Sequence, residues 1–216
     1  MSATRKTGGH CIMENPCITH FVFIGNKIDI KLLYGKLRYL TKLKTRLYRS
    51  EASNTSLRCV AKFFCPEWES YTVDGMLYGL ELTNERQIKL TVVSEAAPYP
   101  EVWFHLARKY QTVKVYYSAT QEQSGQYRTN DAAGRYFPQR YIVVSADGNV
   151  KPFVAQNELY EEVAQAIPLA GTFTTLEAFG KAVKSRLKGI RIFDILVVDN
   201  RGKCISNNQH LISQWL

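Results

Sequence analysis

The chain has 216 residues, of which 45% are hydrophobic and 12% aromatic, so it can bury a sizeable core and is not a wholly disordered polymer. Lysine and arginine number 28 against 19 acidic residues, and this net charge of +9 favours anionic partners without choosing among nucleic acid, acidic protein and lipid surface. No apolar run reaches the roughly 18 residues of a membrane-spanning helix, which excludes an integral membrane protein and predicts no membrane partner.

The cysteines and the first residues bear on location. The chain has five cysteines, an odd number, and its size does not require disulfides for stability. Residues 1–10 are polar and lead into no apolar segment, so we expect no signal peptide. A cytoplasmic protein with reduced thiols is therefore expected.

The first third of the chain predicts a tail, a strand and a long helix. Residues 1–15 are small and polar, as in a flexible tail, whereas residues 17–25 are β-branched and aromatic and predict a buried strand. After a polar loop over residues 50–56, residues 57–64 are interpreted as another strand. A helix is predicted over residues 27–48, with one apolar face formed by Ile30, Leu33, Leu37, Leu40 and Leu47.

The middle third predicts a hairpin, a helix and two more strands. Residues 76–82 and 87–95 flank a polar turn over residues 83–86. Pro98 and Pro100 can begin a helix, because the first-turn amides need no partner within the helix. The apolar stripe of that helix is Trp103, Leu106, Ala107 and Tyr110. Strands are then expected at residues 113–117 and 134–145, with the polar residues 121–133 between them as the tip of a long hairpin.

The last third predicts two helices followed by two strands. The helices are expected at residues 157–167 and 174–187, the second opening on a capping-box pattern at Thr174 and Glu177. Residues 190–198 form a nearly continuous β-branched run, and a short strand follows near residues 203–206.

This order of elements predicts an α+β fold. We expect a ferredoxin-like sandwich over residues 16–153, in which helices cover one face of a mainly antiparallel sheet. Residues 154–216 are expected to form a helix–helix–hairpin extension packed on that core.

Three segments resemble the YubB ferredoxin-like family. The phrase Asn15-Pro16-Cys17 and the strand that runs from it to Gly25 are similar to the opening of that family, and residues 94–106 are similar to its strand, prolines and helix. Val115-Tyr116-Tyr117, followed by Glu122, Gly125 and Tyr127, resembles a later family motif. The resemblance covers about residues 15–145 and implies a protein carried by plasmids, phages or conjugative transposons, with no enzymatic activity attached to the family.

The sharpest charge feature is the predicted first helix. Between residues 27 and 49 the chain carries eight lysines and arginines and a single acid, Asp29, a net +7. Clustered cations bind phosphate backbones favourably because counterions are released. Runs of charged residues, however, ordinarily do no more than solvate an exposed face. The candidate nucleic-acid-binding residues here are Lys31, Lys36, Arg38, Lys42, Lys44, Arg46 and Arg49.

A second hint lies in the later strands, which contain both tyrosines and arginines. Exposed aromatics can stack unpaired bases while arginines hold phosphates, but tyrosines on a half-buried sheet more often serve packing. The candidates in this region are Arg128, Arg135 and Arg140, beside Tyr116, Tyr117, Tyr127, Tyr136 and Tyr141.

Signals for metal binding and catalysis are thin. Cys11, Cys17, His20, Cys59 and Cys65 lack the close pair typical of zinc sites, so buried free thiols are the better interpretation. Nucleophile turns, phosphate loops and dinucleotide motifs are absent from the sequence. Glu67, Glu69 and Asp74 could hold a divalent ion, although a solvated loop is the ordinary explanation. We expect no metal and no cofactor.

The sequence therefore predicts a non-enzymatic accessory protein of a mobile genetic element that acts by binding. Nucleic acid is the leading partner, through the basic helix. The alternative is a protein-interaction module for an acidic partner, and the choice between monomer and homodimer stays open.

Overall fold

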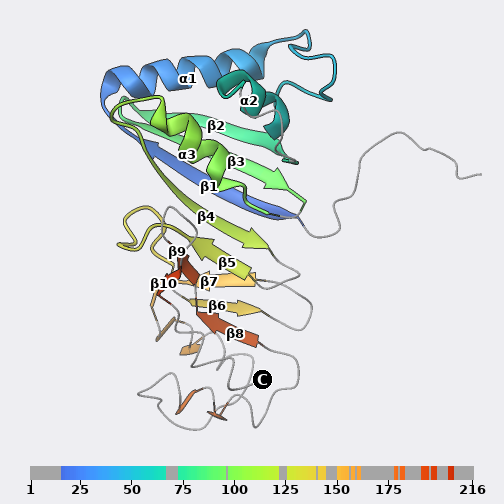
Figure 1. Ribbon diagram of the computed structural model, residues 1–216. Coiled ribbons are helices and arrows are strands. Elements are labelled where there is room, and N and C mark those ends of the chain that lie inside the picture. The colour runs from blue at the N-terminus through green and yellow to red at the C-terminus, as the bar shows by residue number, and fades with distance from the viewer. Residues whose placement is uncertain are drawn as a thin grey trace, which may run out of the picture.

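The computed structural model places several ranges of the chain, with gaps between them (Figure 1). The described residues are 16–66, 73–95, 97–121, 126–139, 141–144, 150–155, 157–158, 160–161, 178–179, 181–182, 191–194, 196–198 and 204–206. The predicted tail over residues 1–15 and most of the two helices predicted in the last third lie outside these ranges.

The protein has an α+β fold, in which helices accompany an antiparallel sheet. The helices are α1 (Lys27–Lys42), α2 (Leu57–Phe64) and α3 (Pro100–Arg108). The first five strands are β1 (Cys17–Ile24), β2 (Met76–Asn84), β3 (Gln87–Ser94), β4 (Lys114–Gln121) and β5 (Gln126–Thr129). The remaining strands are β6 (Tyr141–Val144), β7 (Val150–Phe153), β8 (Arg191–Asp194), β9 (Leu196–Val198) and β10 (Cys204–Ser206).

The main sheet has the strand order β10-β9-β5-β4-β1-β3-β2. Its pairings from β5 to β2 are all antiparallel, with Phe21 of β1 lying between Leu90 of β3 and Tyr117 of β4. Strand β9 joins the edge of β5 in parallel, and β10 pairs antiparallel with β9. A second sheet has the order β7-β6-β8. Residues beyond 190 therefore pair with both sheets.

The core lies between the main sheet and its helices, which cover one face of the sheet in Figure 1. Alternate residues of β1 and β3 point into it, as the period of two in a strand requires. Trp103 of α3 is fully buried against Phe21 and Phe23, with ring centroids 5.3 and 5.9 Å away. Helix α3 begins at Pro100, directly after Tyr99 in the left-handed conformation, and carries Trp103 onto β1.

The segment over residues 57–64 is a helix, so its assignment as a strand was wrong. The Ser56 side chain caps α2 by accepting a hydrogen bond from the Cys59 amide at 3.1 Å. Leu57, Val60 and Phe64 are buried at helical spacing. The period of this segment is therefore that of a helix, and the β-branched and aromatic residues in it were misleading.

Other boundaries also differ from expectation. The strand predicted over residues 134–145 is not a strand over residues 134–139, and β6 begins at Tyr141. Helix α1 ends at Lys42 instead of Tyr48, because Leu43 adopts an extended backbone with ψ of 121°. Residues 126–129, expected in a hairpin tip, form β5 on the edge of β4. Asn130 extends this pairing, since its side chain accepts a hydrogen bond from the Tyr117 amide and donates one to the Val115 carbonyl.

Candidate nucleic-acid interface

Helix α1 is held so that its basic side faces outward. Asn26 caps its N-terminus by accepting a hydrogen bond from the Asp29 amide at 2.8 Å. Ile30, Leu33, Leu37 and Leu40 are at most 1% exposed and fix the rotation of the helix on the sheet. The residues on the opposite side, including the lysines, are left in solvent.

The single acid of the basic segment does not neutralise it. The Asp29 carboxylate accepts hydrogen bonds from the Thr112 amide at 3.0 Å and from the Thr112 hydroxyl at 2.6 Å, which join α1 to the segment before β4. Lys27 pairs with Glu85 at 2.5 Å, but both side chains are largely exposed and such a pair contributes little.

The other cations predicted on α1 are all exposed. Within the ranges that the structure describes, Lys31, Lys36, Arg38 and Lys42 form no ion pair with a carboxylate. Lys36 lies over the Tyr110 ring at 5.7 Å. At about 100° per residue, Lys31, Arg38 and Lys42 project within an arc of about 40° and form one stripe along the helix.

The remaining predicted cations lie in the loop between α1 and α2. Lys44, Arg46 and Arg49 are exposed. The buried Asn54 side chain holds this loop through three hydrogen bonds to its backbone: it accepts from the Leu47 amide at 2.8 Å and donates to the carbonyls of Leu43 and Thr45. The loop therefore presents its cations on a fixed backbone.

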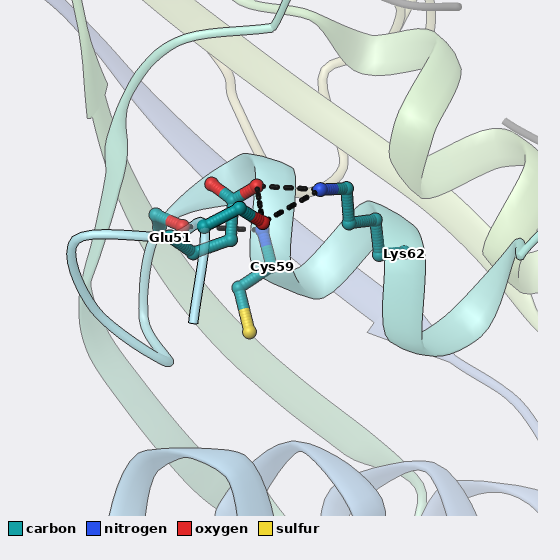
Figure 2. Close-up of polar contacts among 5 residues, drawn as sticks. Glu51, Cys59 and Lys62 are labelled. Carbon is teal, nitrogen blue, oxygen red and sulfur yellow. Dashed lines mark hydrogen bonds and ion pairs between the residues drawn. The ribbon is translucent and has the colours of Figure 1, made fainter. Parts of the chain in front are cut away.

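A buried ion pair ties the end of the loop to α2 (Figure 2). The Glu51 side chain is 6% exposed, and its carboxylate lies 2.7 Å from the amine of Lys62. That amine also donates to the Ser50 hydroxyl at 3.3 Å and lies 5.9 Å from the centre of the Tyr48 ring. Glu51 is thereby committed to Lys62 and leaves the loop cations without their nearest acid.

The Cys59 thiol beside this pair is not an activated nucleophile. Its side chain points away from Glu51 and Lys62 in Figure 2, and it is fully buried. Burial, and to a smaller extent the charge of Glu51, raise the pKa of Cys59, so the thiol stays protonated.

The arginines of the later strands do not join α1. Arg128 lies on β5 and Arg135 is exposed in the loop that follows, whereas α1 packs over β2 and β3. In the sheet order, β5 is three strands from β3, or about 14 Å. Arg140 lies outside the described residues. The two sets of cations that the sequence analysis gave as separate hints therefore lie on separate parts of the fold.

The nearby tyrosines serve packing. Tyr117 is 3% exposed and faces the core, and Tyr127 is 6% exposed. Tyr116 contacts Tyr136, with ring centroids 4.8 Å apart. Tyr117 and Tyr127 are therefore packing residues, whereas Tyr116 and Tyr136 are half-buried and contact each other.

The predicted thiols and acids are accounted for where the structure describes them. Cys17, Cys59 and Cys65 are buried, and the part of the chain that can be described holds no group of three or more potential metal ligands. Asp74 accepts hydrogen bonds from the Glu95 amide and the Tyr99 hydroxyl. The side chains of Cys11, Glu67 and Glu69 lie outside the described residues.

Sequence reasoning missed the residues that organise the basic loop. Asn54, Glu51 and Lys62 gave no local signal, because their partners are 7–12 residues away along the chain. The helical spacing of Leu57, Val60 and Phe64 would have revealed α2 and, with it, a fixed end for the loop.

No family model matches this chain, and no match was found among curated proteins or solved structures. Among the described helices, none combines the length and apolar character needed to cross a bilayer. Function is therefore inferred from the charge and geometry of the chain itself.

Proposed function

We propose that the protein binds nucleic acid through a basic surface formed by α1 and the following loop. The basic surface consists of Lys31, Lys36, Arg38, Lys42, Lys44, Arg46 and Arg49. The observation that carries the proposal is that all of these side chains are exposed and that, within the described ranges, none is paired with a carboxylate. Such a surface repels itself unless a polyanion supplies the countercharge.

The backbone geometry supports the same proposal. The cations on α1 follow one stripe of a capped helix, and those of the loop are held by Asn54. A surface fixed before binding loses little conformational entropy when it meets a phosphate backbone. Binding is expected to be electrostatic and largely independent of base sequence, because lysine and arginine side chains that contact phosphate groups do not read the bases.

We further propose that the sheet and helices form a ferredoxin-like domain. The strand order β4-β1-β3-β2, with one helix after β1 and another after β3, supports this assignment. The role would be that of a non-enzymatic accessory protein of a mobile genetic element, as the resemblance to the YubB ferredoxin-like family implies.

The test compares two variants with the same change in net charge. The first variant, Lys44→Glu/Arg46→Glu/Arg49→Glu, reverses the charge of the three loop cations. The control variant, Arg86→Glu/Lys89→Glu/Lys114→Glu, reverses the charge of three exposed cations outside the basic surface. Fluorescence anisotropy with labelled single-stranded and duplex DNA, at low and increasing salt, measures binding.

The loop variant is expected to weaken binding by roughly tenfold or more at low salt. The slope of log affinity against log salt concentration should fall by the equivalent of about three phosphate contacts. The control variant should bind nearly as the natural protein does. Equal losses in both variants, or binding that does not respond to salt, would refute the proposal.

A further inference from the structure

Helix α1 also exposes large apolar side chains. Ile28 is 70% exposed, and Leu32 and Tyr39 are each 54% exposed. Phosphate groups gain nothing from such side chains, so nucleic-acid binding does not explain them. Contiguous exposed apolar residues mark interaction surfaces more often than isolated ones do.

These residues are spaced like the seam of a coiled coil. Ile28, Leu32, Gly35 and Tyr39 follow one another at intervals of four, three and four residues, and we name them the seam. The seam is about 16 Å long. A side-chain carbon added at Gly35 would meet nothing within 4 Å, so the seam has an open notch between Leu32 and Tyr39.

Cations flank the seam on both sides. Lys31 and Arg38 lie on one flank and Lys36 on the other, and all are exposed. Asp29, on the same flank as Lys36, is occupied by its hydrogen bonds to Thr112. The charged positions beside the seam therefore comprise three cations and one acid, and this net positive charge favours an acidic partner.

We propose that the seam docks an amphipathic helix of a protein partner that carries acidic residues beside its apolar stripe. Its leucines or isoleucines would pack between Ile28, Leu32 and Tyr39, and one large side chain would enter the notch at Gly35. Its glutamates or aspartates would meet Lys31, Lys36 and Arg38. This docking surface is distinct from the loop cations and goes beyond nucleic-acid binding.

The flanking charges argue against a second copy of this chain. Two copies paired through the seam would bring together six cations and only two acids, which gives a net repulsion. A membrane surface fits no better, because a helix that lies in a bilayer presents a broad apolar face and this seam spans an arc of only about 60°.

The experiment uses the full chain and two synthetic helical peptides of about three heptads. Both peptides have leucine at the seam positions, one with glutamate at the flanking positions and the other with lysine. Isothermal titration calorimetry measures binding to the natural protein, to Ile28→Ser/Leu32→Ser and to the matched control Tyr78→Ser/Leu82→Ser. The control removes exposed apolar side chains of β2, which are 68% and 40% exposed. Circular dichroism verifies that both variants fold.

The acidic peptide is expected to bind, and the basic peptide is not. The seam variant should lose at least roughly tenfold in affinity for the acidic peptide, and the control variant should lose little. The seam variant should still bind DNA, whereas Lys44→Glu/Arg46→Glu/Arg49→Glu should still bind the acidic peptide, so the two proposals can fail separately.

Three results would overturn the docking proposal. One is equal binding of the acidic and basic peptides, or equal binding by the natural protein and the seam variant. Another is self-association by size-exclusion mass that Ile28→Ser/Leu32→Ser abolishes, which would make the partner a second copy. The third is seam-dependent binding to phosphatidylserine vesicles without binding of the acidic peptide, which would make it a membrane surface.

Discussion

Helix α1 and the loop over residues 43–56 carry similar cations, but different forces hold them in place. In α1, a cap at Asn26 and a buried stripe at Leu33, Leu37 and Leu40 orient the side chains. In the loop, the Asn54 side chain makes the hydrogen bonds to backbone carbonyls that amides would make in a helix. The ion pair between Glu51 and Lys62 holds the end of the loop. Local periodicity can place charge on a helix, whereas a loop needs distant side chains to do so.

Breaking the anchor of the loop should have the largest effect on stability. Lys62→Met leaves the Glu51 carboxylate buried without its cation, and we expect a loss of somewhat less than about 3 kcal/mol, because the Lys62 side chain is 29% exposed. Urea unfolding measures it. The double variant Glu51→Gln/Lys62→Met should be more stable than Lys62→Met alone. An additive result would show that the pair is not coupled.

Removing the side chain that orders the loop backbone should have the next largest effect. Asn54→Ala deletes three hydrogen bonds and is expected to cost about 1–3 kcal/mol. The hydrogen exchange of the Leu47 amide should accelerate in this variant, while amides within α1 keep their protection. Uniform acceleration across the loop and α1 would indicate that the two regions unfold together and would contradict the comparison.

A substitution in helix α1 is expected to increase the stability of the protein. Gly35→Ala introduces a side-chain carbon where nothing lies within 4 Å, and the lower entropy cost of alanine should stabilise the protein by up to about 1 kcal/mol. Thermal unfolding measures the gain. Unchanged or lowered stability would mean that packing on the sheet, and not helix propensity, determines the stability of α1.

The smallest effect is expected at His20, outside both cationic regions. Its Nδ1 lies 3.2 Å from the Thr91 hydroxyl oxygen, and burial lowers the pKa of His20 below 6.5. The folded state therefore binds the proton less readily than the unfolded state, and stability falls as the pH drops below about 6.5 towards the lowered pKa. Urea midpoints at about pH 7.5 and 5.5 should differ less in His20→Gln than in the natural protein. An equal difference would assign the dependence to other groups.

Much of the candidate site could be predicted from the sequence. The buried positions of α1 from Ile30 to Leu40 recur at the helical period, so the exposed stripe of Lys31, Arg38 and Lys42 followed without coordinates. The pairing of β2 with β3 followed from the alternating runs and the polar turn between them. The apolar seam of Ile28, Leu32 and Tyr39 was also present in the sequence, but only the packing of α1 showed which of its apolar residues stay exposed.

The sequence by itself determined the strands β1 to β4, the face of α1 that is buried and the concentration of positive charge, because periodicity and capping act over a few residues. Only the tertiary structure decided where α1 ends, how the loop is held and that Arg128 and Arg135 lie apart from it. Each of these outcomes depends on hydrogen bonds or strand pairings between residues far apart along the chain. Local composition does not encode such contacts, since an asparagine such as Asn54 or an arginine such as Arg128 can hydrogen-bond to many different partners.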